Sequence, residues 1–212
     1  MTQKPISITV AMRMVHIKNI PHILVHGITH RGSEQANKDY IPIGDSSLIV
    51  SRSEWKIPNT DYYLGDYIPF YFGPRTPMLY EIQHGFNNVK RRNPEEIVYC
   101  IISLQDVIDK RLEGFFTDGH AKNVMTTFYH NSRLGDISQL VRREDVFEHN
   151  WGPQYDNTGE TKRKKSAELL LKDNINPEYI KWFAVYNNQA KSTLINYGVE
   201  EKKILVKQDF YF

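Results

Sequence analysis

The sequence predicts an α+β fold built from short strands, helices and long loops. Residues 97–104 form a continuous apolar run with β-branched side chains, which is typical of a buried strand. Residues 17–26 place apolar side chains at helical spacing, and a glycine follows them as a helix end. Two polar stretches, 29–42 and 53–65, are longer than ordinary connections. Loops of this length are uncommon unless they are functional or disordered, and we expect these two to cover a cleft.

The other elements follow from the same patterns. Strands are predicted at 10–15, 67–72, 179–185 and 204–212, helices at 78–83 and 121–129, a short helix or strand at 46–51, and a third long polar loop at 144–160. Short strands mixed with helices define the α+β class. No repeat, low-complexity tract or linker divides the chain, so we expect a single domain over residues 1–212.

The composition is that of a globular protein, with 40% hydrophobic and 25% charged residues among 212. Cys100 is the only cysteine, so it cannot form an internal disulfide, and a buried free thiol fits a reducing compartment. Residues 1–9 lack the apolar segment of a signal peptide, and no apolar run approaches the roughly 20 residues that cross a bilayer. We therefore expect a soluble cytoplasmic protein with no membrane partner.

Charge and aromatic content permit a nucleic-acid partner without establishing one. The net charge is only +2, but basic residues cluster at 90–92, 142–143 and 162–165, and the chain holds 13 tyrosines and 10 phenylalanines. Basic groups bind phosphates and aromatic rings stack on bases, so these residues could bind a single strand. Basic clusters also occur on solvated faces and aromatic residues in cores, and charge alone favours that simpler interpretation.

Glu168 is the most informative single position. It precedes three leucines, and a carboxylate in an apolar setting must be paired, protonated or functional. The alternative is a solvent-facing glutamate on a helix whose buried stripe is formed by Ala167, Leu170 and Leu171. The local sequence does not decide between these two interpretations.

Polar residues near the start of the chain and after residue 117 provide further candidates. Arg13, His16 and Asn19 recur at a spacing of three and could face one pocket, although an isolated histidine is more often structural. His120 follows a turn signal and is expected at an exposed loop end. The histidines and the single cysteine lack the spacing of a metal site, and the glycine-rich nucleotide motifs are missing.

Several segments, in a common order, resemble the DarT family of DNA ADP-ribosyltransferase toxins. Residues 66–79, DYIPFYFGPRTPML, are similar almost residue for residue to the family signature D-Y-V-P-F-Y-F-x-P-x-S-P-M-L. Shorter resemblances occur at 12–24, 40–44 (YIPIG), 116–121 (FTDGHA), 167–168 and 209–212. Ser166 stands where the family usually has glutamine, and Arg13 where some members have histidine. The first departure puts any role of that glutamine in doubt and leaves Glu168 unaffected.

The resemblance implies an ADP-ribosyltransferase fold, in which a split mixed sheet with flanking helices surrounds a cleft for NAD. It implies transfer of ADP-ribose from NAD, as co-substrate, to a base in single-stranded DNA with release of nicotinamide. The signature is most similar to the thymidine-modifying branch. The resemblance also implies a toxin–antitoxin pair, in which a macrodomain antitoxin of the DarG type removes the modification. No metal is expected.

By the same resemblance the candidate residues take roles. Glu168 is expected to bind the ribose 2′-hydroxyl and stabilise an oxocarbenium-like transition state, and Arg52 to stabilise the anion that develops on the acceptor base. The expected NAD contacts are Arg13, His16, Asn19, Gly44, Arg52 and Tyr71. The expected DNA contacts are Tyr71, Arg75, Met78, His120, Lys162, Arg163, Lys164 and Lys165. The last four are included because they directly precede Glu168 and, being consecutive, cannot all share one helix face.

Two other functions remain compatible with the sequence. The same reaction could use RNA or protein as the acceptor. A catalytically silent protein could instead bind single strands through the same basic and aromatic surface. The second function predicts no release of nicotinamide, and the presence of Glu168 argues against it.

Overall fold

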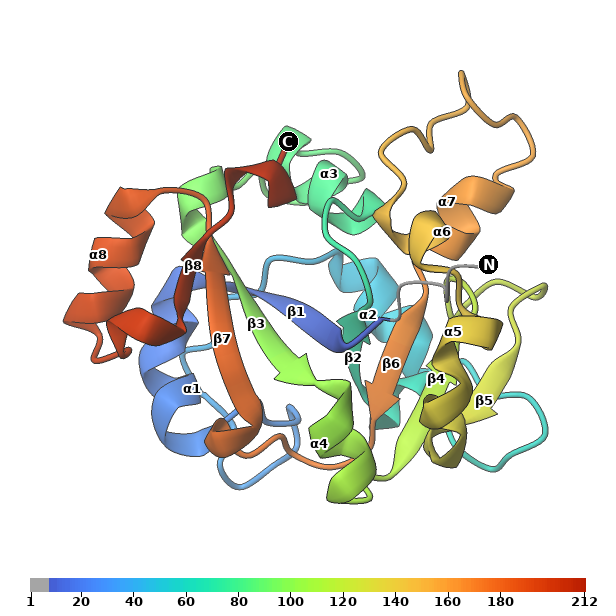
Figure 1. Ribbon diagram of the computed structural model, residues 1–212, viewed down its shortest axis with the longest axis horizontal. Helices are drawn as coiled ribbons and strands as arrows, with labels where there is room; N and C mark the ends of the chain where they lie inside the picture. Colours follow the sequence, from blue (N-terminus) through green and yellow to red (C-terminus); the bar gives the residue numbers. More distant parts are fainter. Residues whose placement is uncertain (1–7) are drawn as a thin grey trace, which may run out of the picture.

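The computed structural model of the protein describes residues 8–212. Residues 1–7 lie outside the described residues, and they include most of the 1–9 segment in which we expected no signal peptide. The described residues form an eight-stranded sheet in the order β5-β4-β6-β2-β1-β3-β7-β8 (Figure 1). The strands are β1 Val10–His16, β2 Ile68–Tyr71, β3 Ile97–Ser103, β4 Gly114–Thr117, β5 Phe128–His130, β6 Glu168–Leu171, β7 Ile180–Val185 and β8 Ile204–Val206. Neighbours are antiparallel except β7 and β8, which are parallel, so the sheet is mixed.

The sheet is split at its middle, between β1 and β2. β1 pairs with β3 along its whole length, whereas within residues 8–212 the pairing of β1 with β2 is limited to Met12 and Tyr71. The side chain of Arg13 spans this seam, because its Nη1 donates a 2.9 Å hydrogen bond to the carbonyl of Pro69. The predicted split mixed sheet is therefore confirmed. At this seam, where the pairing of strands stops, polar side chains can approach the backbone of both halves of the sheet.

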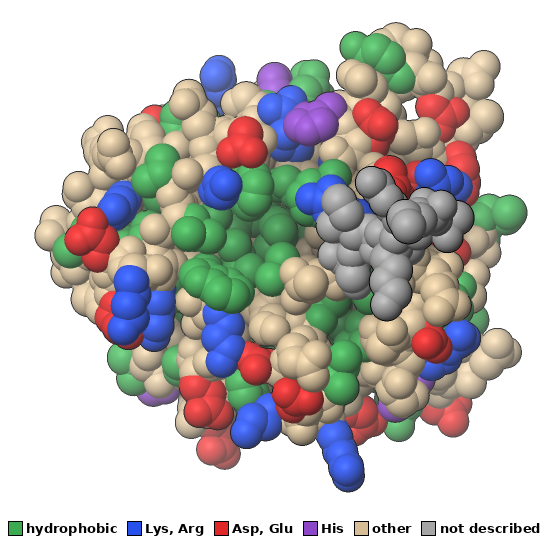
Figure 2. Space-filling view, in the orientation of Figure 1, with side chains coloured by type: hydrophobic (Ala, Val, Ile, Leu, Met, Phe, Trp, Pro, Cys, Tyr) green, Lys and Arg blue, Asp and Glu red, His purple; other side chains and the backbone are tan. Residues whose placement is uncertain are grey.

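Helices cover both faces of the sheet. They are α1 Ile20–His26, α2 Ser46–Ser53, α3 Pro77–His84, α4 Leu104–Asp109, α5 Ile137–Leu140, α6 Arg143–Phe147, α7 Glu160–Lys165 and α8 Asn188–Asn196. The larger core packs α1, α4, α5 and α8 against one face, and a second core packs α3 and Tyr211 against the other. In the view of Figure 2, hydrophobic side chains gather in a hollow where Figure 1 draws β1, β3 and β7. Within residues 8–212, no helix has the length and apolarity needed to span a membrane.

The continuous apolar sequence of β3 follows from the position of this strand between two cores. Every residue from Ile97 to Ile102 is buried, because alternate side chains enter the two cores on opposite faces. Cys100 lies in the larger core, as expected for a buried free thiol. Burial raises the pKa of this thiol to about 12.

Most predicted elements are confirmed, and three need correction. The helix expected at 121–129 is wrong: Phe128–His130 pairs with β4 as the edge strand β5, in keeping with the strand preference of aromatic residues. The last strand ends at Val206, after which Gln208–Phe210 forms a 3-10 helix. The polar loop expected at 144–160 is shorter, because helix α6 occupies its beginning.

Candidate active site

Glu168 and Arg52 form a buried ion pair beside the seam of the sheet. Glu168 begins β6 and its side chain is fully buried, so the interpretation as a solvent-facing helical glutamate is wrong. Arg52 Nη1 lies 3.3 Å from Oε1 and Nη2 lies 3.0 Å from Oε2, while the Ala121 amide donates a 3.1 Å hydrogen bond to Oε1. Burial alone would raise the pKa of Glu168, but Arg52, His120 and these hydrogen bonds hold it below its usual value. The carboxylate is therefore ionised at neutral pH.

The backbone of Glu168 is held by Thr117, at the end of β4. The Glu168 amide donates a 2.9 Å hydrogen bond to Thr117 Oγ1, and this hydroxyl donates a 2.7 Å bond to the Gly119 carbonyl. Thr117 is fully buried. Its hydroxyl thus joins β6 to the turn whose Ala121 amide binds the Glu168 carboxylate. Our sequence reasoning missed Thr117, because one threonine in a strand gives no signal until the neighbouring strand is known.

Arg52 comes from the loosely packed helix α2. Asp45 caps this helix by accepting hydrogen bonds from the amides of Ser47 and Leu48, at 2.7 and 3.3 Å. No residue of α2 is fully buried, although all eight are among those described. Lys122 Nζ donates a 2.7 Å hydrogen bond to Ser51 Oγ and so ties α2 to the turn after β4. The cation of the ion pair is therefore carried by an element with little core packing of its own.

Tyr71, Met78 and His120 surround this ion pair. Tyr71 lies opposite Glu168 in the register of β2 and β6, and its hydroxyl is 3.5 Å from Met78 Sδ. A Cβ at Gly44 would lie 4.0 Å from the same sulfur, so the predicted 40–44 segment also reaches the site. Burial raises the pKa of Tyr71 and lowers that of His120, so both rings are uncharged at neutral pH. His120 is partly buried here, not exposed at a loop end as the sequence suggested.

The residues Arg13, His16 and Asn19 do not face one pocket. Arg13 and His16 both belong to β1, and three residues along a strand place side chains on opposite faces. His16 shares the face of Met12, which pairs with Tyr71, and its Nε2 lies 3.4 Å from Glu96 Oε1. Burial lowers the pKa of His16. The spacing suggested one pocket only because we took β1 to end before His16.

Asn19 contributes through the backbone of the 40–44 segment. Its side-chain amide donates a 2.9 Å hydrogen bond to the carbonyl of Ile41 and accepts a 3.0 Å bond from the amide of the same residue. Asn19 is almost completely buried. Both of these bonds fix the loop that carries Gly44 beside the site.

Comparisons with known proteins identify the family of this chain. The family model described as "ssDNA thymidine ADP-ribosyltransferase, DarT" matches residues 12–212. The chain belongs to the DarT family. A DNA ADP-ribosyl transferase of Escherichia coli O127:H6 is 40% identical over 129 residues, which are 60% of this chain and 58% of that protein. A fusion of DNA ADP-ribosyl transferase and DNA ADP-ribosyl glycohydrolase from Thermosipho africanus is 28% identical over 182 residues, 85% of this chain and 43% of the fusion. The chain thus spans about half the length of these two relatives.

Solved structures of DarT from Thermus sp. 2.9 share the fold. The structure in complex with ADP-ribosylated ssDNA aligns with a TM-score of 0.83 at 25% identity and covers 100% of both chains. The structure in complex with NAD+ aligns with a TM-score of 0.77 at 25% identity and covers 98% of this chain and 100% of the other. This likeness confirms the predicted fold class, the split mixed sheet with flanking helices.

Two of the four basic residues before Glu168 are bound inside this DarT-family protein. Arg163 is 8% exposed, and its guanidinium lies 3.0 Å from Asp118 and 2.7 Å from Glu160. Lys165 is 1% exposed and donates hydrogen bonds of 3.1 and 3.2 Å to the carbonyls of Pro74 and Val146. These buried contacts correct the prediction that Arg163 and Lys165 touch DNA.

The other two basic residues remain accessible. Lys162 is exposed, with its ammonium group 5.9 Å from the ring centre of Trp151. Lys164 is partly exposed and lies 3.6 Å from Glu160. Within the basic run, the accessible positive charge that could meet a phosphate is therefore carried by Lys162 and Lys164.

Arg75 has an unusual backbone that other residues hold in place. Its φ of 52° lies in the left-handed region, which is uncommon for a residue with a side chain. Its amide donates a 3.4 Å hydrogen bond to the Tyr99 hydroxyl, and its Nη1 donates a 2.6 Å bond to the carbonyl of Tyr211. The guanidinium lies 4.3 Å from the ring centre of Phe212. The last residues of the sequence thus fix the arginine expected beside the DNA.

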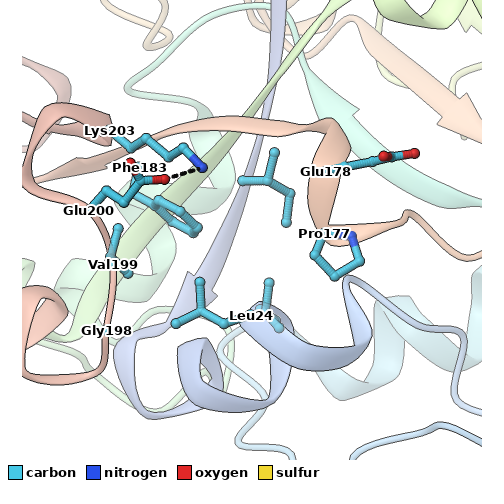
Figure 3. Close-up of a pocket in the computed structure, with 10 residues that line it drawn as sticks. Leu24, Pro177, Glu178, Phe183, Gly198, Val199, Glu200 and Lys203 are labelled. Carbon is cyan, nitrogen blue, oxygen red and sulfur yellow. Dashed lines mark ion pairs between the residues drawn. The ribbon is translucent and has the colours of Figure 1, made fainter.

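A separate depression of about 220 Å³ lies away from these residues. Figure 3 shows Leu24, Phe183 and Val199 around it, and the ion pair of Lys203 with Glu200, at 2.9 Å, on one side. Its lining belongs to segments near α1, β7 and α8, whereas the predicted site residues lie elsewhere. Among residues 8–212, no three His, Cys, Asp or Glu side chains are grouped as a metal site would require.

Proposed function

We propose that this DarT-family protein transfers ADP-ribose from NAD to a thymidine base in single-stranded DNA and releases nicotinamide. The observation that carries the proposal is the buried, ionised Glu168 paired with Arg52 at the seam of a split sheet. The description of the matched family supports this substrate, and the Thermus relatives whose structures contain NAD+ or ADP-ribosylated ssDNA support both partners.

The carboxylate has an oxygen available for a substrate hydroxyl. Glu168 Oε2 is buried and accepts no hydrogen bond of good geometry from residues 8–212, although Arg52 Nη2 is close. A buried acceptor without a donor costs free energy, so a hydroxyl that reaches Oε2 binds favourably. The ribose 2′-hydroxyl of NAD supplies such a donor. His16, Gly44, Tyr71 and the Asn19-bound loop would line the path of NAD on this face, with Arg13 reaching the seam from the other.

The fixed negative charge suits the first half of the reaction. As the bond between ribose C1′ and nicotinamide breaks, its electron pair leaves with nicotinamide and positive charge develops on the ribose. Glu168 places a carboxylate beside this charge in a water-poor setting. It therefore stabilises the transition state more than the ground state.

The positive charge of Arg52 suits the second half. A thymine ring nitrogen is a poor nucleophile until it loses its proton, and Arg52 would stabilise the anion that results. The proton of this nitrogen is released to solvent, and the new bond joins the nitrogen to ribose C1′. Tyr71, Met78 and His120 would form the walls of the base pocket. An unpaired base can enter such a pocket without the cost of leaving a duplex, which accounts for single-stranded DNA as substrate.

We propose a macrodomain antitoxin of the DarG type as the protein partner. The Thermosipho relative, in which a transferase and a glycohydrolase are fused, supports a functional pairing of the two activities. In such a toxin–antitoxin pair, the hydrolase would remove the ADP-ribose that this protein adds.

One experiment tests the proposed reaction and its alternatives. The protein is incubated with NAD and single-stranded oligonucleotides in which each thymidine is replaced in turn, and the added ADP-ribose is located by mass spectrometry. We expect modification of thymidine, with one nicotinamide released per transfer. Modification of RNA or protein in a competition assay, with DNA unmodified, would overturn the DNA substrate. No release of nicotinamide would instead indicate a silent binding protein.

A further inference from the structure

Five aromatic rings from three separate segments meet beside the proposed base pocket. These rings, which we call the aromatic cluster, belong to Tyr80, His84, Phe86, Trp151 and Phe212. The ring centre of Tyr80 lies 4.0 Å from that of His84, 5.5 Å from that of Trp151 and 5.1 Å from that of Phe212. The rings of His84 and Phe86 are nearly parallel, at 4° and 5.7 Å. The cluster is continuous, and the site residues proposed above do not include any of its members.

Helix α3 connects the cluster to the pocket. Thr76 caps the helix and Pro77 occupies its first turn, while Met78 faces Tyr71 in the site. Tyr80 and His84 are four residues apart and therefore share one side of the helix. From Met78 to His84 the helix rises by about 9 Å, at 1.5 Å per residue. A strand that places one base against Met78 reaches the cluster with neighbouring nucleotides.

A glycine turns the chain so that the outermost ring stays on this surface. Gly85 ends α3 with a φ of 73°, in the left-handed region that glycine adopts readily, and its amide bonds to the Glu81 carbonyl. The next residue, Phe86, stacks on His84 and remains 48% exposed. His84 is also exposed. Both rings therefore keep surface that a nucleotide can reach.

Positive charges lie beside the rings. The Arg75 guanidinium is 4.3 Å from the ring centre of Phe212, and the Lys162 ammonium is 5.9 Å from that of Trp151. Arg91 lies next to the end of α3, because a Cβ placed on Gly85 would be 3.2 Å from the Arg91 Cβ. Lys90 and Arg91 are exposed. Rings flanked by cations match a single-stranded nucleic acid, whose bases stack while its phosphates bind basic groups.

We propose that the aromatic cluster is a stacking platform for bases that neighbour the target thymidine. This inference rests on the proposed function and extends it from the modified base to its flanking nucleotides. Stacking accepts any base, so the platform would add affinity and hold the strand without defining the sequence. An apolar peptide of a protein partner would meet the same rings, but the flanking cations favour the polyanion.

Binding without NAD tests the platform separately from the chemistry. Dissociation constants are measured by fluorescence anisotropy for a short oligonucleotide of about two nucleotides, which ends before the cluster, and a long one of about fifteen, both with the same thymidine. The variant is Phe86→Ala, which removes an exposed ring. Phe86→Trp keeps an aromatic face there. The matched control is Ile195→Ala, which removes an apolar side chain, 40% exposed, from helix α8, an element that contributes no ring to the cluster.

We expect Phe86→Ala to weaken binding of the long oligonucleotide by roughly 5-fold or more, since one stacked base contributes a factor of this size. Binding of the short oligonucleotide should change little, and Phe86→Trp and Ile195→Ala should match the unsubstituted protein. Equal effects on both lengths, or none on the long one, would overturn the platform. Failure of the proposed function would look different, because the unsubstituted protein would then leave DNA unmodified in the presence of NAD.

Discussion

The two charged partners of the site are held in very different ways. Glu168 lies on a strand paired on both sides, by β2 and β4, and its amide is bound by the buried Thr117 hydroxyl. Arg52 lies on α2, which has no fully buried residue, and its side chain is 11% exposed. The carboxylate is therefore fixed by the sheet, whereas the guanidinium is carried by a helix with little core packing and is held by its contact with Glu168. We infer that substrates enter by displacing α2 and Arg52, while Glu168 stays in place.

The largest effect is expected from the fixed partner. Glu168→Gln keeps the shape of the side chain and removes its charge, so it should lower both transfer to DNA and NAD hydrolysis by on the order of 100- to 1,000-fold. Rates of nicotinamide release with and without DNA measure both activities. Thermal unfolding of the same variant is the control for folding. Near-normal turnover in a folded Glu168→Gln protein would remove this residue from the mechanism.

The partner on the loosely packed helix should affect the two activities unequally. Arg52→Ala should lower transfer to DNA by on the order of 100-fold and NAD hydrolysis much less, because Arg52 would serve the acceptor base. An equal loss would instead place Arg52 on NAD.

The same variant makes a pH prediction. Arg52 lowers the pKa of Glu168 and burial raises it, so removing Arg52 should raise that pKa. The carboxylate would then protonate as the pH falls. Residual hydrolysis by Arg52→Ala should therefore decrease at a higher pH than in the unsubstituted protein, and superimposable pH–rate profiles would contradict the pairing.

A smaller effect is expected from the residue that positions the carboxylate. Thr117→Val leaves the Glu168 amide without its acceptor, which should lower the free energy of unfolding by about 1–3 kcal/mol. The displaced carboxylate should lower kcat by roughly 10-fold, with the KM for NAD nearly unchanged. Thr117→Ser restores the hydroxyl and should restore kcat. If the serine variant were as slow as the valine variant, the methyl packing of Thr117, and not its hydroxyl, would be responsible.

The smallest effect concerns the accessible charges of the basic run. Replacing Lys162 and Lys164 by glutamine should flatten the salt dependence of DNA binding by about 1.4 units, or 0.7 per phosphate contact, and weaken binding to every sequence. Arg163→Gln should leave this slope unchanged and lower the free energy of unfolding by about 2 kcal/mol, because it breaks charged hydrogen bonds to Asp118 and Glu160. An unchanged salt dependence in the double variant would indicate that the basic run is a solvated surface that does not bind phosphates.

The sequence predicted the strands of the sheet better than the geometry of the site. Strands β1, β2, β3 and β7 have apolar patterns that need no knowledge of neighbours, and all four are present. The helix expected at 121–129 failed because its aromatic residues pair with β4, a contact between distant segments. Arg163 and Lys165 were misassigned for a related reason. Only folding brings a carboxylate and two carbonyls to a run that looks solvated.

The family resemblance predicted which residues lie in the site, but not how their side chains are oriented. The family signature pointed to Tyr71 and Met78, which do lie together. It could not show that Arg13 and His16 point to opposite faces, because that depends on where β1 ends. The role of Thr117 could not be predicted for a similar reason. Its hydroxyl bonds to Glu168 on the neighbouring strand and to Gly119 in the turn, which only the folded structure brings together.

The burial of Cys100 makes it practical to attach a single label to α2 and to measure whether this helix moves. It is the only cysteine of the chain, it is completely inaccessible in β3, and its thiol is protonated at neutral pH because its pKa is about 12. Thiolates are the species that react with maleimides, so the native protein has almost no background labelling. A cysteine introduced at Ile49, 48% exposed on α2, could therefore carry a single fluorophore or spin label. Such a probe would report in real time whether the helix moves away when NAD arrives.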